Sequence, residues 1–506
     1  MNDANNIKSI VIVGGGSAGW MTASALAKVI GCDNCQITLV ESADIGTVSV
    51  GEATIPQIQL FNTILDIDES EFIRFTNATF KLGIEFIDWK EKGHRYFHPF
   101  GSYGTNMEAL PFHHFWLKMQ NDPEFSDLSS YSLASVGAYA NKFMHPSTQQ
   151  NSALAGINYA YHFDATLYAK FLRNYATSRG VCRIEGKVDE VNLNPVSGEI
   201  ESLVLNDNTV LDGDLFIDCS GFKGLLIEQA LKTGYEDWTH LLPCNKAIAM
   251  PCLSKKALNP YTQSTAQSAG WTWRIPLQNR VGNGYVYSSE FMSDDKAHAL
   301  LLNTIESEAL ADINQLQWVT GMRKKSWNKN CIAIGLSAGF VEPLESTGLH
   351  LIQSAIAKLM TLFPSKDFTQ CDIDLFNQQT ETEYHRIRDF IILHYKLTNR
   401  EDSEFWRYCK NIEMPDSLKQ KIEMFSENGR IFRHDNELFN ETSWLAVMHG
   451  QGIKPKSYHP LVDRLTQDEI KRRLKNIESV ISRSADVMPD HEAYIFKKLH
   501  ALALGI

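Results

Sequence analysis

The most constraining feature of this sequence is a short β-branched run that enters a glycine-rich turn, SIVIVGGGSAGW at residues 9–20. Gly14, Gly16 and Gly19 have the spacing G-x-G-x-x-G. In such a turn the first glycine allows a tight bend, the second lets a pyrophosphate approach the backbone, and the third lets the following helix pack closely on the strand. That helix directs its N–H groups and its positive dipole end at the phosphates.

The flanking residues supply the strand–turn–helix–strand order that this motif requires. A helical pattern covers Met21 to Ile30, and a second apolar run, Gln36 to Val40, follows it. The run ends in Glu41, about 20 residues after the glycines, where a partner for a ribose hydroxyl belongs. We therefore expect an ADP-containing cofactor; a glycine-rich turn without a ligand is the alternative.

Length and charge exclude some classes of function. The chain has 506 residues, room for about three domain-sized units that can interleave. Asp and Glu (60) outnumber Lys and Arg (48), which argues against a nucleic-acid footprint. No apolar run reaches the roughly 18 residues of a spanning helix, and residues 1–8 are polar, without a signal-peptide core. We expect a soluble, cytoplasmic protein that binds neither nucleic acid nor membrane.

The cysteines and histidines do not predict a metal site. Nine cysteines spread over a long chain suit reduced thiols, and the C-x-x-C of Cys32 and Cys35 has no matching pair nearby. We therefore favour a surface loop there over a zinc or redox site. Four histidines gather among aromatic residues without a common ligand spacing: His94, His98, His113 and His114. Packing or pocket lining is favoured for them over ligation.

Two stretches after Glu41 have open interpretations. TVSVGEATIP (47–56) suits either a strap along a flat cofactor ring or a turn before a helix near Pro56. Lys81 is the only cation in FTNATFKLGIEF (75–86). A lysine in such a pattern usually keeps its ammonium at a solvent edge with the stem buried. If the amine is desolvated, its pKa falls and it becomes a useful nucleophile or proton donor.

The middle of the chain carries an aromatic stretch and a strand-rich stretch. Tyr96 to Trp116 is predicted as a loop-rich wall, either a satellite core cluster or one face of a pocket for a flat apolar ligand. Val188 to Val210 is predicted as a β-meander, and LFIDCSG (215–221) as a buried strand with a helix from about Leu225. Asp218 then lies near the cofactor or caps the turn.

Two later stretches carry candidate site residues. Trp271 and Trp273, in GWTWRIPL (270–277), lie on one face if the segment is a strand. They form either ordinary core or a wall that excludes water. In the segment 332–354 a buried strand leads through glycine turns to a helix expected near Ser346 or Thr347, whose N–H groups make a ready anion site. Glu345 precedes this helix, and simple capping is the alternative role for it.

Four of these motifs together resemble the flavin-dependent halogenases of the tryptophan-halogenase type: GGGSAGW (14–20), the lysine of FKLGIEF, W-x-W-x-I-P (271–276) and PLESTG (343–348). The resemblance runs from residue 9 to beyond residue 450. It implies an α/β fold with a Rossmann-like FAD-binding module of the flavin-monooxygenase kind, an interleaved substrate-binding part and a mostly helical C-terminal region. The FAD-binding module is expected at 1–100, 155–230 and 315–365. The substrate-binding part is expected at 101–154, 231–314 and 366–506.

The resemblance also implies a reaction. FADH2 from a separate NAD(P)H-dependent reductase, together with O2, would convert chloride or bromide to hypohalous acid, with the halide held by the backbone N–H groups of Thr347 and Gly348. The acid would reach Lys81 through an internal passage, and Lys81 would orient it or carry the halogen as a haloamine. Glu345 would stabilise or deprotonate the cationic intermediate that forms when the aromatic ring attacks.

Further positions follow from the same resemblance. Cofactor contacts are expected at Gly14, Gly16, Ser17, Ala18, Gly19, Glu41, Val50, Ala53, Val188, Leu336 and Leu349. A substrate pocket is expected from His98, Phe100, Trp271, Trp273, Ser346 and Trp444. The two tryptophans would keep the substrate away from the oxidising flavin. Family members are often dimers, and this sequence leaves the oligomeric state open.

One segment departs from the tryptophan-specific members, which hold the ammonium and carboxylate of the amino acid with a lid that contains Tyr and Glu. In the corresponding segment, Leu438 to Ile453, Glu441 is the only Asp, Glu, Lys or Arg. We therefore expect a more open site for an indole or a larger aromatic. A flavin-dependent hydroxylase is one alternative, although it needs neither Lys81 nor the tryptophan pair; a non-catalytic flavin-binding protein is another.

Beyond residue 366 the chain is expected to be mostly helical. Thr466 and Glu469 form a capping box. Four apolar residues then recur on one face of a helix: Ile470, Leu474, Ile477 and Ile481. We interpret this segment as a packing helix, not as a partner-binding one.

Overall fold

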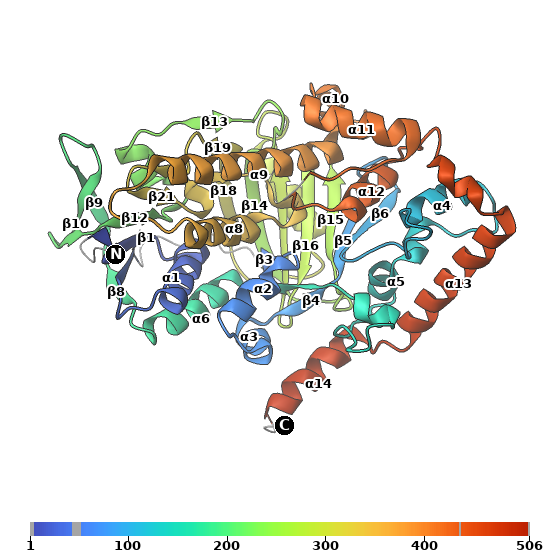
Figure 1. The fold of residues 1–506 in the computed structure, drawn as a ribbon, viewed down its shortest axis with the longest axis horizontal. Helices are drawn as coiled ribbons and strands as arrows, with labels where there is room; N and C mark the ends of the chain where they lie inside the picture. Colours follow the sequence, from blue (N-terminus) through green and yellow to red (C-terminus); the bar gives the residue numbers. More distant parts are fainter. Residues whose placement is uncertain (1–4, 43–51, 435–436, 504–506) are drawn as a thin grey trace. The chain divides into compact units, whose positions relative to one another are not determined.

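The computed structural model describes residues 5–42, 52–434 and 437–503 (Figure 1). Two compact units are each assembled from three stretches of chain. The first unit comprises 1–77, 163–245 and 316–385, and the second comprises 78–162, 246–315 and 386–506. The expected module borders differ from these: 78–100 and 155–162 fall in the second unit, and 231–245 and 366–385 fall in the first. The ligand that each unit takes stays a prediction.

The first unit is organised by a mostly parallel sheet in the order β20-β21-β12-β1-β2-β8. Its strands are β1 (Ser9–Val13), β2 (Gln36–Glu41), β8 (Cys182–Glu185), β12 (Leu215–Asp218), β20 (Trp327–Asn328) and β21 (Cys331–Ala333). β1 pairs in parallel with both β2 and β12, so its β-branched residues are buried at the centre. α1 (Ser17–Val29) follows β1 directly and packs against α6 (Ala165–Thr177) and α8 (Gly348–Thr361). This is the predicted Rossmann-like arrangement.

The predicted meander is present in the first unit as β9 (Val188–Leu193), β10 (Ile200–Leu205) and β11 (Val210–Asp212). Its apolar face joins Val11, Val13 and Phe216 of the central sheet in one core cluster. A second small sheet consists of β13 (Tyr235–Asp237), β19 (Gly321–Arg323) and β22 (Gly339–Phe340).

The remaining elements of the first unit are short, except for one helix. They are β3 (Glu52–Ala53), α2 (Gln57–Ile64), α3 (Glu69–Thr76), the 3-10 turns at Gly221–Lys223, Gly335–Ser337 and Pro343–Glu345, and a π-helix at Leu225–Ala230. The long α9 (Gln370–Lys396) begins in this unit and ends in the second.

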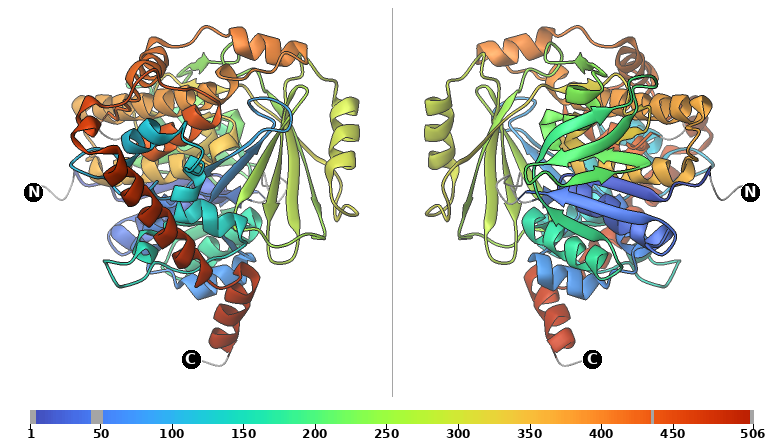
Figure 2. Two further views of the ribbon diagram at one scale, coloured as in Figure 1. Left: turned by 90° about the vertical axis from the view of Figure 1, so that its right-hand side faces the viewer. Right: turned by 90° about the vertical axis from the view of Figure 1, so that its left-hand side faces the viewer.

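The second unit contains a long, mainly antiparallel sheet in the order β18-β14-β17-β16-β15-β5-β6 (Figure 2). Its strands are β5 (Gly83–Ile87), β6 (Arg95–Pro99), β14 (Lys246–Cys252), β15 (Thr262–Gln267), β16 (Gly270–Pro276), β17 (Val281–Tyr287) and β18 (Asn314–Gln317). β15 and β5 form its parallel pair. α7 (Asp294–Thr304) covers one face, where Ala297 and Leu301 pack on Tyr285 and Tyr287.

Helices make up most of the second unit after residue 386, as predicted. They are α10 (Glu404–Asn411), α11 (Asp416–Asn428), α12 (Glu441–Gly450), α13 (Gln467–Asp486) and α14 (His491–Ala503). Thr466 caps α13 through the Glu469 N–H, and Ile470, Leu474 and Ile481 are buried, so the predicted packing helix is confirmed. Among the described residues no helix is both long and apolar enough to cross a bilayer.

The stretch from Tyr96 to Trp116 is loop-rich over residues 100–111, as predicted, but its two ends are regular elements. β6 covers its start and α4 (Phe112–Met119) covers its end, and α5 (Leu133–Tyr139) comes soon afterwards. β6 is a strand because its backbone pairs with β5 from Gly83 to Ile87. Local sequence shows prolines, glycines and aromatic residues but does not show this partner, so the pattern did not predict the strand.

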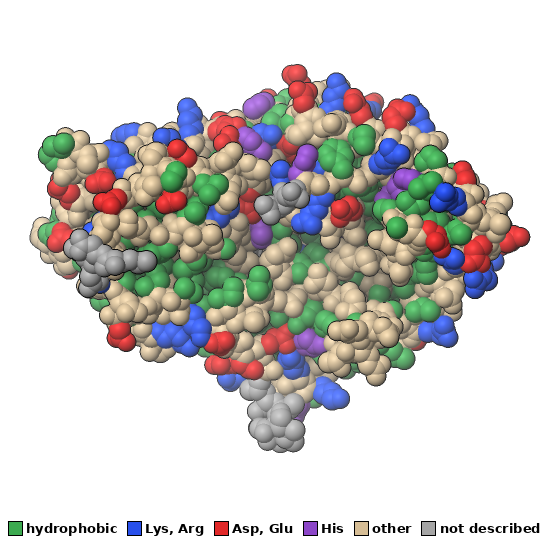
Figure 3. Space-filling view, in the orientation of Figure 1, with side chains coloured by type: hydrophobic (Ala, Val, Ile, Leu, Met, Phe, Trp, Pro, Cys, Tyr) green, Lys and Arg blue, Asp and Glu red, His purple; other side chains and the backbone are tan. Residues whose placement is uncertain are grey.

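Charged side chains of both signs lie on the surface, and the C-x-x-C pair lies in a turn. On the face in Figure 3, acidic and basic side chains alternate over the surface. Cys32 and Cys35 lie in the turn between α1 and β2, and burial raises the pKa of the Cys35 thiol to about 11, which makes it unreactive at neutral pH. The described residues contain no group of three or more His, Cys, Asp and Glu that could hold a metal ion.

Candidate active site

The glycine turn between β1 and α1 has the shape of a phosphate cradle. Gly14 has φ +116°, and a Cβ there would lie 2.2 Å from the Cys219 carbonyl oxygen. A Cβ on Gly19 would lie 1.8 Å from the carbonyl oxygen of Gly14, so helix and turn touch at this glycine. A Cβ on Gly16, in contrast, would have no described atom within 4 Å. The turn is therefore closed on the protein side and open at Gly16, where a pyrophosphate would approach.

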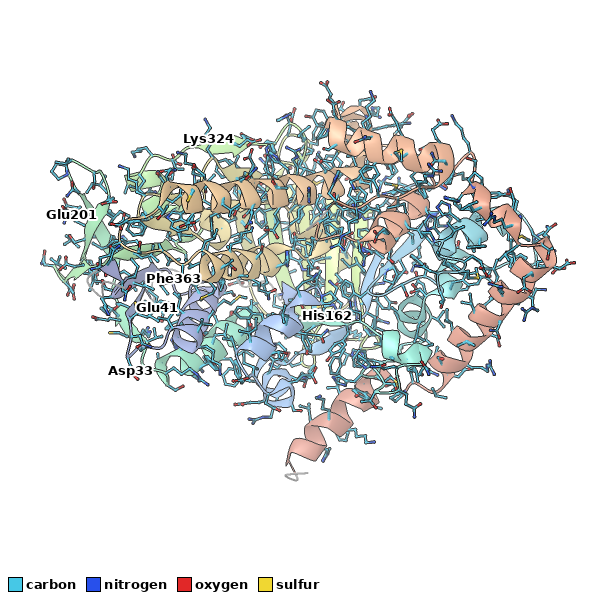
Figure 4. The ribbon with its side chains drawn as sticks, in the orientation of Figure 1. Asp33, Glu41, His162, Glu201, Lys324 and Phe363 are labelled. Atoms are coloured by element: carbon cyan, nitrogen blue, oxygen red, sulfur yellow. The ribbon has the colours of Figure 1, made fainter. Side chains whose placement is uncertain are left out.

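The carboxyl ends of the adjacent strands carry two acidic residues with different surroundings. Glu41, labelled in Figure 4, accepts a hydrogen bond from the Trp20 indole N–H at 3.1 Å and pairs with Arg183. Asp218 is fully buried and accepts from the backbone N–H of Leu226 and Ile227, both at 2.8 Å. Asp218 therefore caps the turn, which was one of its two predicted roles, while Glu41 is held by Trp20 and Arg183 and its role as a ribose partner stays a prediction.

The other predicted cofactor contacts lie at several places in the first unit. Ser17 and Ala18 form the partly exposed first turn of α1, and Leu336 is partly exposed in the turn before β22. Val188 belongs to the core cluster under the meander, while Leu349 is buried on α8. Ala53 is at the end of β3. Val50 and the first half of the predicted strap (47–56) lie outside the described residues.

The segment before α8 is strained and buried. Glu345, Ser346 and Thr347 are 1%, 6% and 0% exposed. Ser346 has φ +60°, a left-handed conformation that costs a non-glycine residue about 1–3 kcal/mol and is common at functional sites. The Thr347 hydroxyl has no hydrogen-bond partner among the described residues, and a Cβ on Gly348 would have no described atom within 4 Å. This helix start thus combines N–H donors, a buried hydroxyl and open space.

Lys81 ends β4 (Thr79–Lys81), a strand that pairs with β7 (Ala160–Phe163) in the second unit. Its side chain is 0% exposed, so the pattern-based expectation of a solvent-edge ammonium is wrong. The strand is buried on both faces, which local sequence cannot show. The Nζ atom lies 5.3 Å from the centre of the Phe100 ring, in cation–π geometry. Lys81 and Phe100, both predicted site residues, are therefore neighbours.

The two tryptophans of W-x-W-x-I-P lie on β16 with ring centroids 6.1 Å apart. Both are buried, at 2% and 7% exposure, so the predicted shared face is confirmed. Gly284 on β17 makes this possible, because a Cβ there would lie 2.1 Å from the Trp273 ring. The Trp273 indole nitrogen has no hydrogen-bond partner among the described residues. A water-excluding wall and a packed core are both consistent with this geometry.

His98 and Trp444, from β6 and α12, meet at one aromatic cluster. The ring of Phe390 stacks on that of Phe439, with centroids 3.8 Å apart. Its centroid lies 5.9 Å from that of the His98 ring and 4.9 Å from that of the Trp444 ring. A small, partly open pocket adjoins the cluster, lined by Arg386, Ile387, Glu437, Leu438, Phe439 and Trp444. Two of the predicted substrate-pocket residues thus lie together in the second unit.

The segment that departs from the tryptophan-specific lid forms the loop before α12 and α12 itself. Glu441 is exposed at the start of α12. Glu437, just before the segment, is 3% exposed and pairs with Lys421 at 3.1 Å, and the Lys421 ammonium lies over the Trp444 ring. The Glu437 carboxylate, which lines this pocket, is therefore paired within the protein.

Comparison with known proteins identifies the family. The family model described as tryptophan halogenase matches residues 9–467. The chain belongs to the tryptophan halogenase family. This membership confirms the resemblance drawn from the four motifs.

Individual relatives match over more than nine-tenths of this chain and of their own lengths. A solved flavin-dependent halogenase from Xanthomonas campestris is 44% identical with a TM-score of 0.94, over 97% of this chain and 98% of that chain. BrvH, a flavin-dependent halogenase from Brevundimonas, is 43% identical with a TM-score of 0.94, over 97% and 99%. The tryptophan 6-halogenase SttH of Streptomyces toxytricini is 37% identical, over 92% of this chain and 93% of its own.

These matches favour a flavin-dependent halogenase over the two alternatives, a hydroxylase and a non-catalytic flavin-binding protein. They also confirm the α/β fold with its Rossmann-like module. The roles of individual residues stay predictions.

Sequence analysis missed Thr79 within the Lys81 strand and the two residues that contact this strand, His162 and His491. Their spacing contains no motif, because His162 and His491 lie 83 and 411 residues from their partners on β4. The only usable signal is the strand-like AYHF at 160–163, which gives His162 a strand but no neighbour.

Proposed function

We propose that this enzyme halogenates an electron-rich, indole-type aromatic ring by electrophilic substitution, with FAD delivered as FADH2 by a separate NAD(P)H-dependent reductase. The bound cofactor would supply two electrons to O2, and the halide ion would give up the other two as it becomes hypohalous acid, with the second oxygen atom leaving as water. The first unit supports this with the cradle at Gly14, Gly16 and Gly19, whose open side at Gly16 suits a dinucleotide pyrophosphate.

The start of α8 would hold chloride or bromide. The backbone N–H groups of Thr347 and Gly348 supply donors and the helix dipole supplies positive potential. Two observations support this place: the buried Thr347 hydroxyl without a described partner, and the open space beside Gly348. Backbone donors do not select between the two halides, so the preference is left to measurement.

Lys81 and Glu345 would act on the substitution itself. The Lys81 amine would hold hypohalous acid by a hydrogen bond or carry the halogen as a haloamine, and the Glu345 carboxylate would take the proton that leaves the aromatic ring. Both side chains are buried, at 0% and 1% exposure, so water competes weakly for either contact. The single observation that carries the proposal is the full burial of Lys81, the only cation of its segment.

An indole or a larger aromatic suits the site better than free tryptophan. The cluster of His98, Phe390, Phe439 and Trp444 offers flat apolar contacts. Glu437, which would attract an ammonium group, is paired with Lys421. In the neighbouring segment, Leu438 to Ile453, the only Asp, Glu, Lys or Arg is Glu441, and it is exposed.

The experiment is incubation of the purified protein with indole, bromide, FAD, a flavin reductase and NADH in air, with products identified by mass spectrometry. A brominated indole supports the proposal, and comparison with free tryptophan tests the substrate class. A product that gains one oxygen atom overturns it in favour of a hydroxylase. The absence of any product across a panel of aromatics overturns it in favour of a flavin-binding protein.

A further inference from the structure

The strand that carries Lys81 is held by a buried histidine on its partner strand. His162, labelled in Figure 4, lies on β7 opposite Thr79, two residues before Lys81. The imidazole Nδ1 lies 3.0 Å from the Thr79 hydroxyl and Nε2 lies 2.9 Å from the Thr262 hydroxyl. Since residues two apart in a strand share a face, this contact lies on the Lys81 side of β4.

The hydrogen-bond pattern assigns the tautomer of His162. The Thr79 hydroxyl donates its one proton to the carbonyl of Pro276 at 2.7 Å, so it accepts from Nδ1–H. Burial, followed by the positive charge of Lys81, lowers the pKa of His162 well below its ordinary value, so the ring stays neutral and Nε2 accepts from Thr262. The pair of threonines thus holds an uncharged imidazole in one orientation.

A second histidine closes the backbone edge of the same strand. The Phe80 N–H, one residue before Lys81, donates to Nε2 of His491 at 3.1 Å. Nδ1 of His491 lies 2.6 Å from the carbonyl of Leu258, so Nδ1 carries the proton. Burial lowers the pKa of His491 to about 4, against the opposing effects of the Leu258 carbonyl and Asp490. β4 lies at a sheet edge, and this imidazole takes the place of a further strand.

The two imidazole rings have the same burial and the same hydrogen-bond roles. Each is fully buried, donates through Nδ1 and accepts through Nε2. A charged imidazole at either position would place a second cation close to Lys81 and would point an N–H at the Thr262 hydroxyl or at the Phe80 N–H. His491 lies in α14, beyond residue 467 where the family match ends.

We propose that His162 and His491 are positioning residues for Lys81: two uncharged imidazoles fix β4 at the residues before the lysine and set the direction of its amine without adding positive charge beside it. This rests on the proposed role of Lys81 in halogen transfer. The C-terminal helix α14 is then part of the support of the reactive amine.

The first test is kinetic. His491→Ala and His162→Ala should lower kcat for indole bromination about tenfold or more, since small misplacements of a reactive group cost this much. KM for indole should change less than about twofold, because neither ring is proposed to bind substrate. His491→Gln and His162→Gln keep an amide donor and acceptor and should recover part of the loss. Oxygen consumption should persist, so that product per O2 falls.

The control is His113→Ala. His113 lies on α4 and is buried, and its Nε2 atom lies 2.8 Å from the carbonyl oxygen of Gly429. This substitution should destabilise the protein without lowering product per O2. If the His162 and His491 alanine variants behave like His113→Ala, or if the glutamine variants recover nothing, the positioning role is overturned.

The second test needs no turnover. ¹⁵N NMR of histidine-labelled protein should show both rings as neutral Nδ1–H tautomers throughout about pH 6–9. An Nε2–H tautomer or a titration in that range overturns the proposal. A wild-type enzyme that makes no halogenated product while showing these tautomers would instead overturn the proposed function, so the two failures are distinguishable.

Discussion

The start of α8 in the first unit and the strand β4 in the second differ in whether their polar groups have hydrogen-bond partners within the protein. At the helix start the Thr347 hydroxyl has no described partner, and Gly348 faces open space. On β4 the Thr79 hydroxyl and the Phe80 N–H are both used by partners within the protein. The first arrangement suits a place that receives an ion, and the second suits a place that keeps a reactive side chain still.

The same contrast holds along α8 itself. Beyond its open start, three side chains on one face of the helix converge on Glu383 of α9: His350 at 3.0 Å, Ser354 at 2.8 Å and Lys358 at 2.6 Å. One carboxylate thus fixes α8 to α9 over two turns. A helix held this firmly keeps its N-terminal donors in a constant position, which a preformed anion site requires.

The strongest test of the contrast is Lys81→Ala. We expect halogenation to fall by about 10³-fold, in the range for loss of a group that acts directly on the reacting atoms. Flavin affinity, measured by quenching of flavin fluorescence, should persist because the cradle lies in the first unit. Loss of both activity and flavin binding would mean that the buried lysine is only structural.

Glu383→Gln tests the fixed part of α8. Burial alone would raise the pKa of Glu383, but the hydrogen bond from His350 and the charge of Lys358 outweigh it and lower the pKa to about 2. A lowered carboxyl pKa stabilises the fold above the unfolded value of about 4.5, and this stabilisation, about 3 kcal/mol, is lost as the pH falls towards 2. Urea denaturation at pH 7 and at pH 4 should show the wild-type advantage shrink at the lower pH.

The matched control for Glu383→Gln is Glu401→Gln, which changes an exposed carboxylate paired with Lys410. It should shift the urea midpoint very little, because exposed ion pairs contribute little. Equal midpoints for the two variants would contradict the assigned role of Glu383.

Glu345→Gln removes the proposed base but keeps the shape of the side chain. We expect kcat for bromination to fall about 10²-fold, with KM for bromide unchanged, as for loss of a general base. A change in bromide KM without a change in kcat would place Glu345 at the ion instead, and would weaken the division of roles between the start of α8 and the residues that act on the ring.

Gly348→Ala and Gly16→Ala have the smallest expected effects. Together they distinguish the proposed halide site from the proposed pyrophosphate site. Each adds a methyl group where the protein leaves space. Gly348→Ala should raise KM for bromide about tenfold, about 1.4 kcal/mol, and leave flavin affinity unchanged; Gly16→Ala should do the reverse. If both variants fold normally and neither constant changes, neither glycine faces its proposed ligand.

Some parts of the structure could be predicted because their signal is local. The strand–turn–helix at 9–29, the meander, the shared face of Trp271 and Trp273, the helix after PLESTG and the cap at Thr466 all depend on residues within a few positions of each other. Glycine spacing and the two-residue period of a strand directly express backbone sterics. These features were therefore visible in the sequence.

Other parts could not be predicted because their partners are remote in sequence. The burial of Lys81, the strand at 95–99 and the role of Gly284 beneath Trp273 each depend on a neighbouring strand. The local pattern alone favoured a solvent-edge Lys81, whereas the family resemblance implied an internal position, and the packing around β4 shows that the side chain is buried.

The sequence by itself determined the family, the glycine cradle and the identity of the reactive candidates, because motif spacing records what each backbone turn must do. Only the tertiary structure decided where their side chains lie: that Lys81 is buried, that His162 and His491 contact its strand, and that the start of α8 leaves open space. The physical reason is that burial and hydrogen-bond partnership are properties of the surroundings, and segments separated by hundreds of residues supply those surroundings.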